Sequence, residues 1–348
     1  MAANSTDSIS KSITIIERPE FNDMYLEEVD FSYKNFKEVS FKGANLINAN
    51  LQFAIFEGAN LSGANFYGAN LQNANFKNAN LSNCKMYKAN LSGANLTNTF
   101  LNNANLSGAN LTDAILMRAD LTNTNLKAAN LTNTILTKAI LYKCNLQEAT
   151  LDHTNFNHAD LRGANLNKTI INNTLFENAI LNSVSIQQSR CNRLNFKDAQ
   201  MTKAKLNMST LMETNFVNAN LEYAELNNCN LINSIFNQAN LTGATLQNST
   251  INNSQFMIAN LNETNLSNAN LSCANLTGAK LVNTNLTRAE LMNTILISTL
   301  IYDVTATYAN FTRAKLVDAT IKITDFRNSI MDNVNVTGAT IEDCEFPH

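Results

Sequence analysis

The sequence predicts an all-β solenoid, in which the chain coils around one axis with four sides per turn. Three observations lead to this prediction: a large apolar residue at nearly every fifth position from Phe21 to Phe346, a small residue two positions before it, and phenylalanine at intervals of twenty residues. Of the 348 residues, 45% are hydrophobic and only 15% are charged. A core can therefore form along the whole length of the repeats.

The five-residue period defines the repeat. The large series includes Leu46, Leu51, Phe56, Leu61, Phe66 and Leu71, and the small series includes Ala44, Ala49, Ala54, Ala59, Ala64 and Ala69. Five residues turn about 500° on an α-helix, so these positions would leave no apolar stripe there. On a flat strand they would alternate between the two faces. The chain must turn a corner in each repeat, and a disordered Asn-rich tract would not keep this phase.

Phenylalanine, glycine and proline give the number and place of the corners. Phenylalanines recur every twenty residues, or four repeats, at Phe36, Phe56, Phe76, Phe156, Phe176, Phe196, Phe216, Phe236 and Phe256. All 10 glycines lie two residues after a large apolar position, where a corner needs an unusual φ. Both prolines, Pro19 and Pro347, flank the repeats, because proline inside would interrupt the ladder.

The units Ala59-Asn60-Leu61-Ser62-Gly63 and Ala119-Asp120-Leu121 resemble the A(D/N)LXX motif of the pentapeptide repeat family. The resemblance covers roughly residues 21–346 and implies a right-handed quadrilateral β-helix. About 65 repeats would give about 16 coils. We expect residues 1–20 to cap the first coil, residues 21–346 to form one repeat domain, and residues 347–348 to be a tail. The C-terminal coil either caps itself or docks onto a partner, with a homodimer as one option.

The motif degrades between Val184 and Lys205, where Cys191 is small and Leu194 is large; Val304 and Ala306 repeat this swap. One interpretation is volume compensation in the core. The other is a kink or bulge beside a site for an anionic ligand. The candidate basic patch at this place consists of Arg190, Arg193, Lys197, Lys203 and Lys205.

A second candidate surface comes from the residue just before the large position, which is usually Asn. On the side that carries the phenylalanines this residue is apolar six times, at Ile55, Ile115, Ile135, Leu175, Ile235 and Ile295. If it points outward, one side of the rod is patchily apolar and could bind a partner. Scattered surface isoleucines on β-strands are also ordinary.

The sequence contains no recognisable catalytic, cofactor or metal motif. Its 3 His and 6 Cys lack metal-site spacing, and phosphate-loop, nucleophile-elbow and dinucleotide fingerprints are absent. Most cysteines replace small or large core residues, which suits a reducing, cytoplasmic setting. There is no signal peptide and no transmembrane run, although secretion without a signal stays open. We therefore predict a protein that is not an enzyme.

The favoured function is a rigid scaffold or regulator that binds another protein. The alternative, implied by the resemblance, is a DNA mimic that binds DNA gyrase and protects it from quinolones or toxins. The net charge of −3 and the absence of acids between Glu57 and Asp113 disfavour that alternative. Nucleic-acid binding has little support, since the cations form no stripe and Tyr67, Tyr87 and Tyr142 are expected to be isolated. The roughly 60 Asn reflect either amide ladders along the rod or genome composition.

Overall fold

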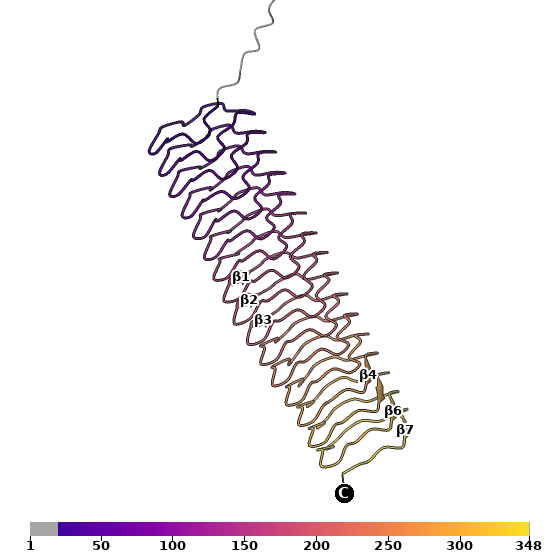
Figure 1. Cartoon of the computed structure of the whole chain (residues 1–348). Helices are drawn as coiled ribbons and strands as arrows, with labels where there is room; N and C mark the ends of the chain where they lie inside the picture. The colour runs from indigo at the N-terminus through magenta and orange to yellow at the C-terminus, as the bar shows by residue number, and fades with distance from the viewer. Residues whose placement is uncertain (1–19, 348) are drawn as a thin grey trace, which may run out of the picture.

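Each five-residue repeat folds into a short extended segment followed by a corner. In the computed structural model, which describes residues 20–347, the amide of Ala44 donates to the carbonyl of Phe41 over 3.0 Å, and Gly43 between them has φ of 68°. This combination is typical of a type II turn, whose third residue needs positive φ. The predicted corner position of glycine is thus confirmed. The same turn repeats along the rod (Figure 1).

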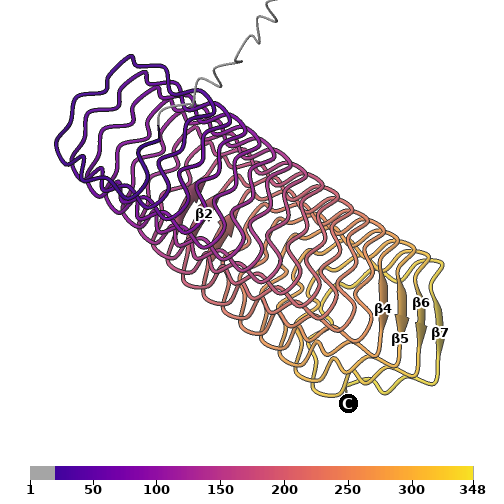
Figure 2. The ribbon, with the colours of Figure 1, turned by 45° about the horizontal axis from the view of Figure 1, so that its top comes forward.

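Successive coils join through parallel backbone bridges between residues twenty apart, from Glu20↔Ser40 to Asp325↔Glu345. Four bridges occur per twenty residues, so each coil has four sides (Figure 2). We number the sides by their first bridging residue: side 1 begins at Glu20, side 2 at Tyr25, side 3 at Asp30 and side 4 at Asn35. A corner is named by the two sides that it joins.

Within residues 20–347, longer strands form in two places. On side 3 the parallel sheet contains β1 (Ile170–Asn172), β2 (Arg190–Asn192) and β3 (Thr210–Met212). On side 1 it contains β4 (Lys280–Val282), β5 (Leu300–Tyr302), β6 (Thr320–Lys322) and β7 (Thr340–Glu342). All pairs keep the spacing of twenty residues. The structure is therefore a four-sided β-solenoid, as the sequence predicts.

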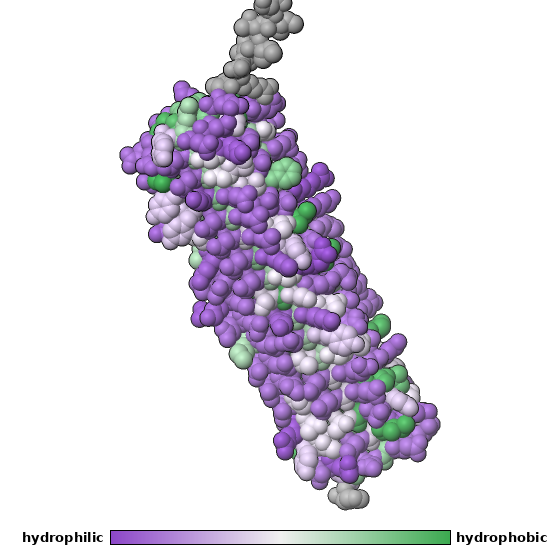
Figure 3. All heavy atoms as spheres, in the orientation of Figure 1, coloured by the Kyte–Doolittle hydropathy of each residue, from purple (hydrophilic) through white to green (hydrophobic). Residues whose placement is uncertain are grey.

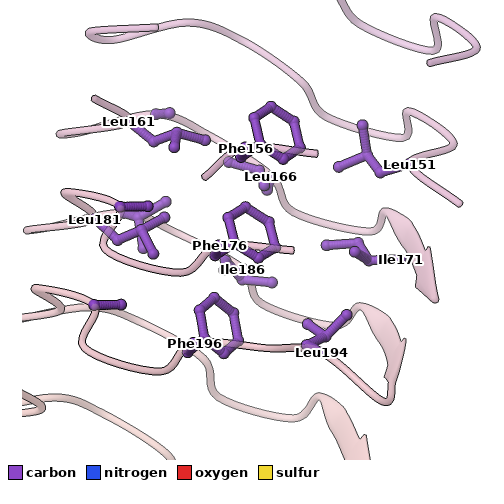
Figure 4. Packing of buried hydrophobic residues seen from close by; sticks show 14 of the residues in the cluster. Leu151, Phe156, Leu161, Leu166, Ile171, Phe176, Leu181, Ile186, Leu194 and Phe196 are labelled. Carbon is purple, nitrogen blue, oxygen red and sulfur yellow. The ribbon is translucent and has the colours of Figure 1, made fainter. Parts of the chain in front are cut away.

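The large and small residues of the repeat point inward and form one continuous core. Phenylalanines of side 4 stack along the axis, with ring centroids 5.0 Å apart for Phe156 and Phe176 and 4.8 Å apart for Phe176 and Phe196 (Figure 4). Both rings of each pair are nearly parallel. Because every coil has the same dimensions, a ring in one coil lies directly over the ring in the next.

The degraded motif does not interrupt the coil. Cys191 and Leu194 are both buried, and Leu194 lies beneath Ile171 where a large residue at position 191 would otherwise pack (Figure 4). The bridges Ile180↔Gln200 and Ser185↔Lys205 keep their register, so the bulge considered for this stretch is absent. The swap is volume compensation: a larger neighbour fills the space that a smaller side chain leaves.

The predicted N-terminal cap lies outside the described residues, except for Glu20. Between residues 20 and 347 no helix is long and apolar enough to cross a membrane.

Candidate interaction surfaces

The bridging Asn residues have a specific local role. The side-chain oxygen of Asn110 accepts hydrogen bonds from the amide and hydroxyl of Thr112, at 3.1 and 2.7 Å. This Asx turn guides the chain into the corner and explains why Asn or Asp occupies the position. Asn110 Nδ2 also donates to Asn90 Oδ1 in the preceding coil over 3.2 Å. Such amide-to-amide bonds join some successive coils, as in Asn105, Asn125 and Asn145, but they do not run along the whole rod.

All six apolar residues predicted as one surface lie on side 4: Ile55, Ile115, Ile135, Leu175, Ile235 and Ile295. Polar residues separate most of them, since Asn155 bridges Leu175 and Asn215 bridges Ile235. Only Ile115 and Ile135 bridge each other directly. The six residues therefore share a side without forming one continuous patch.

Around Ile115 and Ile135 the apolar surface extends across corner 4/1. Met117 lies in the corner and Ile140 lies on side 1, and these two side chains are 39% and 44% exposed. We call these four residues the apolar edge. Figure 3 shows one face of the rod, which is largely hydrophilic with small green areas. A small apolar area flanked by polar residues is an ordinary feature of protein-binding surfaces.

The structure does not bring the five predicted basic residues together. Arg190 lies on side 3, and Lys205 lies on side 2, where it bridges Glu225. Arg193, Lys197 and Lys203 occupy three different corners, so the five cations encircle the rod. Arg193 Nε donates to Glu213 Oε2 over 2.8 Å, and Lys197 Nζ lies 3.6 Å from Glu177 Oε1.

A pocket of about 460 Å³ lies at corner 3/4, beside β1, β2 and β3. Its lining residues are Asp152, His153, Asn172, Asn173, Asn192, Arg193, Met212 and Glu213. Only Arg193 belongs to the sequence-predicted set. The other seven lining residues share no motif and recur at intervals of twenty along the chain, so the sequence does not single them out. The one sequence signal near them is the degraded repeat between Val184 and Lys205.

The polar side chains of this pocket mostly satisfy one another. Asn172 Nδ2 donates to Asp152 Oδ1 over 2.8 Å, and Asn192 Nδ2 donates to Asn172 Oδ1 over 3.2 Å. The ladder ends at Met212, because its side chain has no amide group. The buried Asn192 Oδ1 therefore accepts no hydrogen bond. The pocket thus offers hydrogen-bonding groups but no activated nucleophile.

Two of the tyrosines expected to be isolated are neighbours. Tyr67 and Tyr87 occupy corner 2/3 in successive coils, with ring centroids 5.6 Å apart. The expectation was wrong because twenty residues along the chain correspond to one coil in space. Tyr142 lies elsewhere, near the side chains of Lys143 and Arg162.

Several titratable groups have shifted pKa values. Hydrogen bonds from Arg162 hold the pKa of the Asp160 carboxyl below its ordinary value. Burial raises the pKa of the Cys84 thiol to about 12 and that of Cys229 to about 11. Among residues 20–347 no group of three or more His, Cys, Asp or Glu could hold a metal ion.

Comparison with known proteins gives one family. The family model for pentapeptide repeats matches residues 21–63, 44–83, 64–103, 74–113, 114–151, 144–182, 179–216, 214–253 and 259–296. No curated protein matches the sequence.

Solved structures of pentapeptide repeat proteins are similar over part of the chain. HetL from the cyanobacterium Nostoc sp. strain PCC 7120, which is involved in heterocyst differentiation regulation, is 26% identical with a TM-score of 0.26, over 71% of this chain and 89% of HetL. QnrB1, a plasmid-mediated fluoroquinolone resistance protein, is 14% identical with a TM-score of 0.37, over 55% and 89%. Rfr23 from the cyanobacterium Cyanothece 51142 is 22% identical with a TM-score of 0.25, over 35% and 90%. TM-scores this low carry no argument about function.

Proposed function

The chain belongs to the pentapeptide repeat family, and on this premise we propose that it is a non-enzymatic scaffold or regulator that binds another protein through the apolar edge. The observation that carries the proposal is the direct bridge between Ile115 and Ile135, with Met117 and Ile140 exposed beside them. Elsewhere on side 4 polar bridging residues separate the apolar residues from one another. The buried thiols fit the proposed cytoplasmic location.

The test is a double substitution, Ile115→Asn with Ile135→Asn. Asn is the usual residue of these columns, so the variant should fold normally. Partners are cross-linked to the wild-type protein and identified, and the affinity of each is then measured with purified components. We expect at least a tenfold loss of affinity in the variant. The matched control, Ile55→Asn with Ile295→Asn, lies on the same side and should bind normally. Equal binding by both variants would refute the proposal.

The DNA-mimic alternative has weaker support. A mimic of DNA needs dense negative charge along the rod, whereas no acid occurs between Glu57 and Asp113. A gyrase supercoiling assay with and without the protein, at matched salt, tests the alternative. Inhibition at micromolar protein, or protection against a quinolone, would favour the mimic over the scaffold.

A homodimer through the C-terminal coil is a further proposal about partners. Val336, Ile341 and Phe346 are exposed on residues 327–346, which favours association. The same twenty residues carry one cation, Arg327, and four acids, so two such coils repel each other. We therefore expect a dimer only at high ionic strength, where charge is screened. Sedimentation at 0.05 and 1 M salt tests this, and a dimer at low salt would contradict it.

A further inference from the structure

On sides 2 and 3, near corner 2/3, the bridging Asn side chains present hydrogen-bond donors to solvent. The Oδ1 atoms of Asn65, Asn70, Asn90 and Asn105 all accept backbone amides two residues further on, at 3.1 to 3.4 Å. Within residues 20–347 none of these four side chains donates a hydrogen bond through Nδ2. Because the turns occupy the acceptor atoms, the groups left to bind a ligand are NH₂ donors.

Two lysines strengthen this donor character. Lys85 lies on side 2 between Asn65 and Asn105, which it bridges on either side. Lys88 lies in corner 2/3 with its ammonium 5.1 Å from the ring centroid of Tyr87. Neither lysine forms an ion pair with another residue among those described, and no acid occurs from residue 58 to residue 112. We call Asn65, Asn70, Asn90, Asn105, Lys85 and Lys88 the donor surface.

The same columns already bind carboxylates elsewhere in the molecule. One or two coils nearer the N-terminus, Asn45 Nδ2 donates to Glu27 Oε1 over 2.6 Å on side 2. On side 3, Asn50 Nδ2 donates to Asp30 Oδ1 over 3.2 Å. At these two places a carboxylate of the chain pairs with the amide, although Glu290, which bridges Asn270 and Asn310 on side 3, does not. On the donor surface the chain supplies none.

We propose that the donor surface binds an acidic segment of a partner polypeptide, whose carboxylates accept hydrogen bonds from these amides, as the carboxylates of Glu27 and Asp30 do in the first coil. Charged acceptors form the stronger hydrogen bonds with these donors. A single-stranded nucleic acid fits less well, because the rings of Tyr67 and Tyr87 pack against each other at an interplanar angle of 35° and few cations are present to neutralise phosphates. The donor surface lies on sides 2 and 3, so the proposal does not depend on the apolar edge.

The experiment measures binding of a fluorescent decaglutamate peptide to the full chain. Decaglutamine of the same length and a ten-nucleotide oligothymidine serve as comparison probes. In one variant, Asn65→Asp with Asn70→Asp, the carboxylate keeps the Asx turn but replaces each outward donor by an acceptor. In a second variant, Lys85→Asn with Lys88→Asn, the charge is removed while Asn suits both positions. Circular dichroism and thermal unfolding verify that both variants fold.

Controls use the same substitutions at distant places. Asn265→Asp with Asn270→Asp changes the same two columns far along the rod, where the Asx turns are equivalent. Lys203→Asn with Lys205→Asn again changes one corner and one bridging position.

We expect decaglutamate to bind the wild-type protein in a salt-dependent manner and to lose at least tenfold in affinity with each of the two test variants. Both controls should bind like wild type, and decaglutamine should not bind measurably. Equal binding of decaglutamine, unchanged binding by the Asn65→Asp, Asn70→Asp variant, or tighter binding of oligothymidine would each overturn the proposal.

Discussion

At two of the repeat positions where asparagine recurs, it is favoured for two different physical reasons. At the bridging position its side-chain oxygen accepts the amide two residues further on, as Asn60 does for Ser62. In the corner its backbone adopts positive φ, as in Asn248 at 57°, which Asn tolerates better than most residues. Both preferences are local, so they repeat in every coil without help from distant residues.

Ile258 occupies a positive-φ corner position at which Asn or Gly is more common, and its substitution gives a prediction. Its φ is 60° and its side chain is 63% exposed, so a β-branched residue is strained there with little burial in return. We expect Ile258→Asn to stabilise the protein by about 1 kcal/mol. The midpoint of urea unfolding measures the effect. The reverse change at a matched corner, Asn253→Ile, should destabilise the protein by a similar amount. Stabilisation of the protein by both substitutions would contradict the explanation.

Within a coil, the packing depends on total volume more than on any single position. Leu194 compensates for Cys191 because both point into the same layer, and the coil keeps its register. The sequence shows this swap, but two interpretations of it remain open until the backbone is known. Likewise, no sequence signal distinguishes the coils that form β1–β7 from those held by single bridges. In the β3 coil the Thr214 amide donates to Ser234 Oγ, but the Cys229 amide makes the same contact with Ser249 Oγ where no longer strand forms.

Phe216 tests how the phenylalanine column is stabilised. Its ring lies between Phe196 and Phe236, with centroids 5.3 and 4.7 Å away. We expect Phe216→Ala to cost about 3–5 kcal/mol through the cavity that it leaves. Leucine occupies other coils of this column, so Phe216→Leu should cost less than about 1.5 kcal/mol. Denaturant unfolding measures both changes. An equal loss for the two variants would indicate that ring stacking, not volume, stabilises the column.

Across the whole rod, the interior is uniform and the surface is not. The core runs through every coil, whereas the apolar edge, the corner 3/4 pocket and the donor surface each occupy a few coils. In a solenoid each coil contacts only its neighbours, so distant surfaces can change independently. This independence is why the control substitutions proposed above can be placed on the same molecule.

The cysteines report on the folded interior as a whole. Cys84, Cys144, Cys191 and Cys229 are buried, Cys273 is exposed and Cys344 is intermediate. We therefore expect a thiol reagent to modify two of the six cysteines quickly and the other four only after unfolding. Rapid modification of all six in the native protein would contradict the continuous core.

The same thiols predict a pH dependence. Their pKa values are raised in the folded state by burial, to about 12 for Cys84 and about 11 for Cys229, so the unfolded chain loses these protons first as pH rises. The stabilisation by each protonated thiol is complete below about pH 8.5 and is lost progressively above it, up to about pH 11 for Cys229 and about pH 12 for Cys84. Thermal unfolding should show a shallower alkaline decline when Cys84, Cys144 and Cys229 are replaced by Ala. An unchanged slope would exclude the thiols as its cause.

Local chemistry alone is sufficient to predict the repeat, the inward and outward positions, the corners and the four-sided coil, because each five-residue unit meets the same requirements. Contacts between outward side chains follow different rules, since they join residues twenty apart whose pairing depends on charge and rotamer. The tertiary structure therefore decided that Tyr67 and Tyr87 touch, that the five basic residues encircle the rod, and that Asp152, Asn172 and Asn192 form one ladder ending at Met212. The interior is determined by a periodic pattern, whereas each surface depends on which neighbours the coil places side by side.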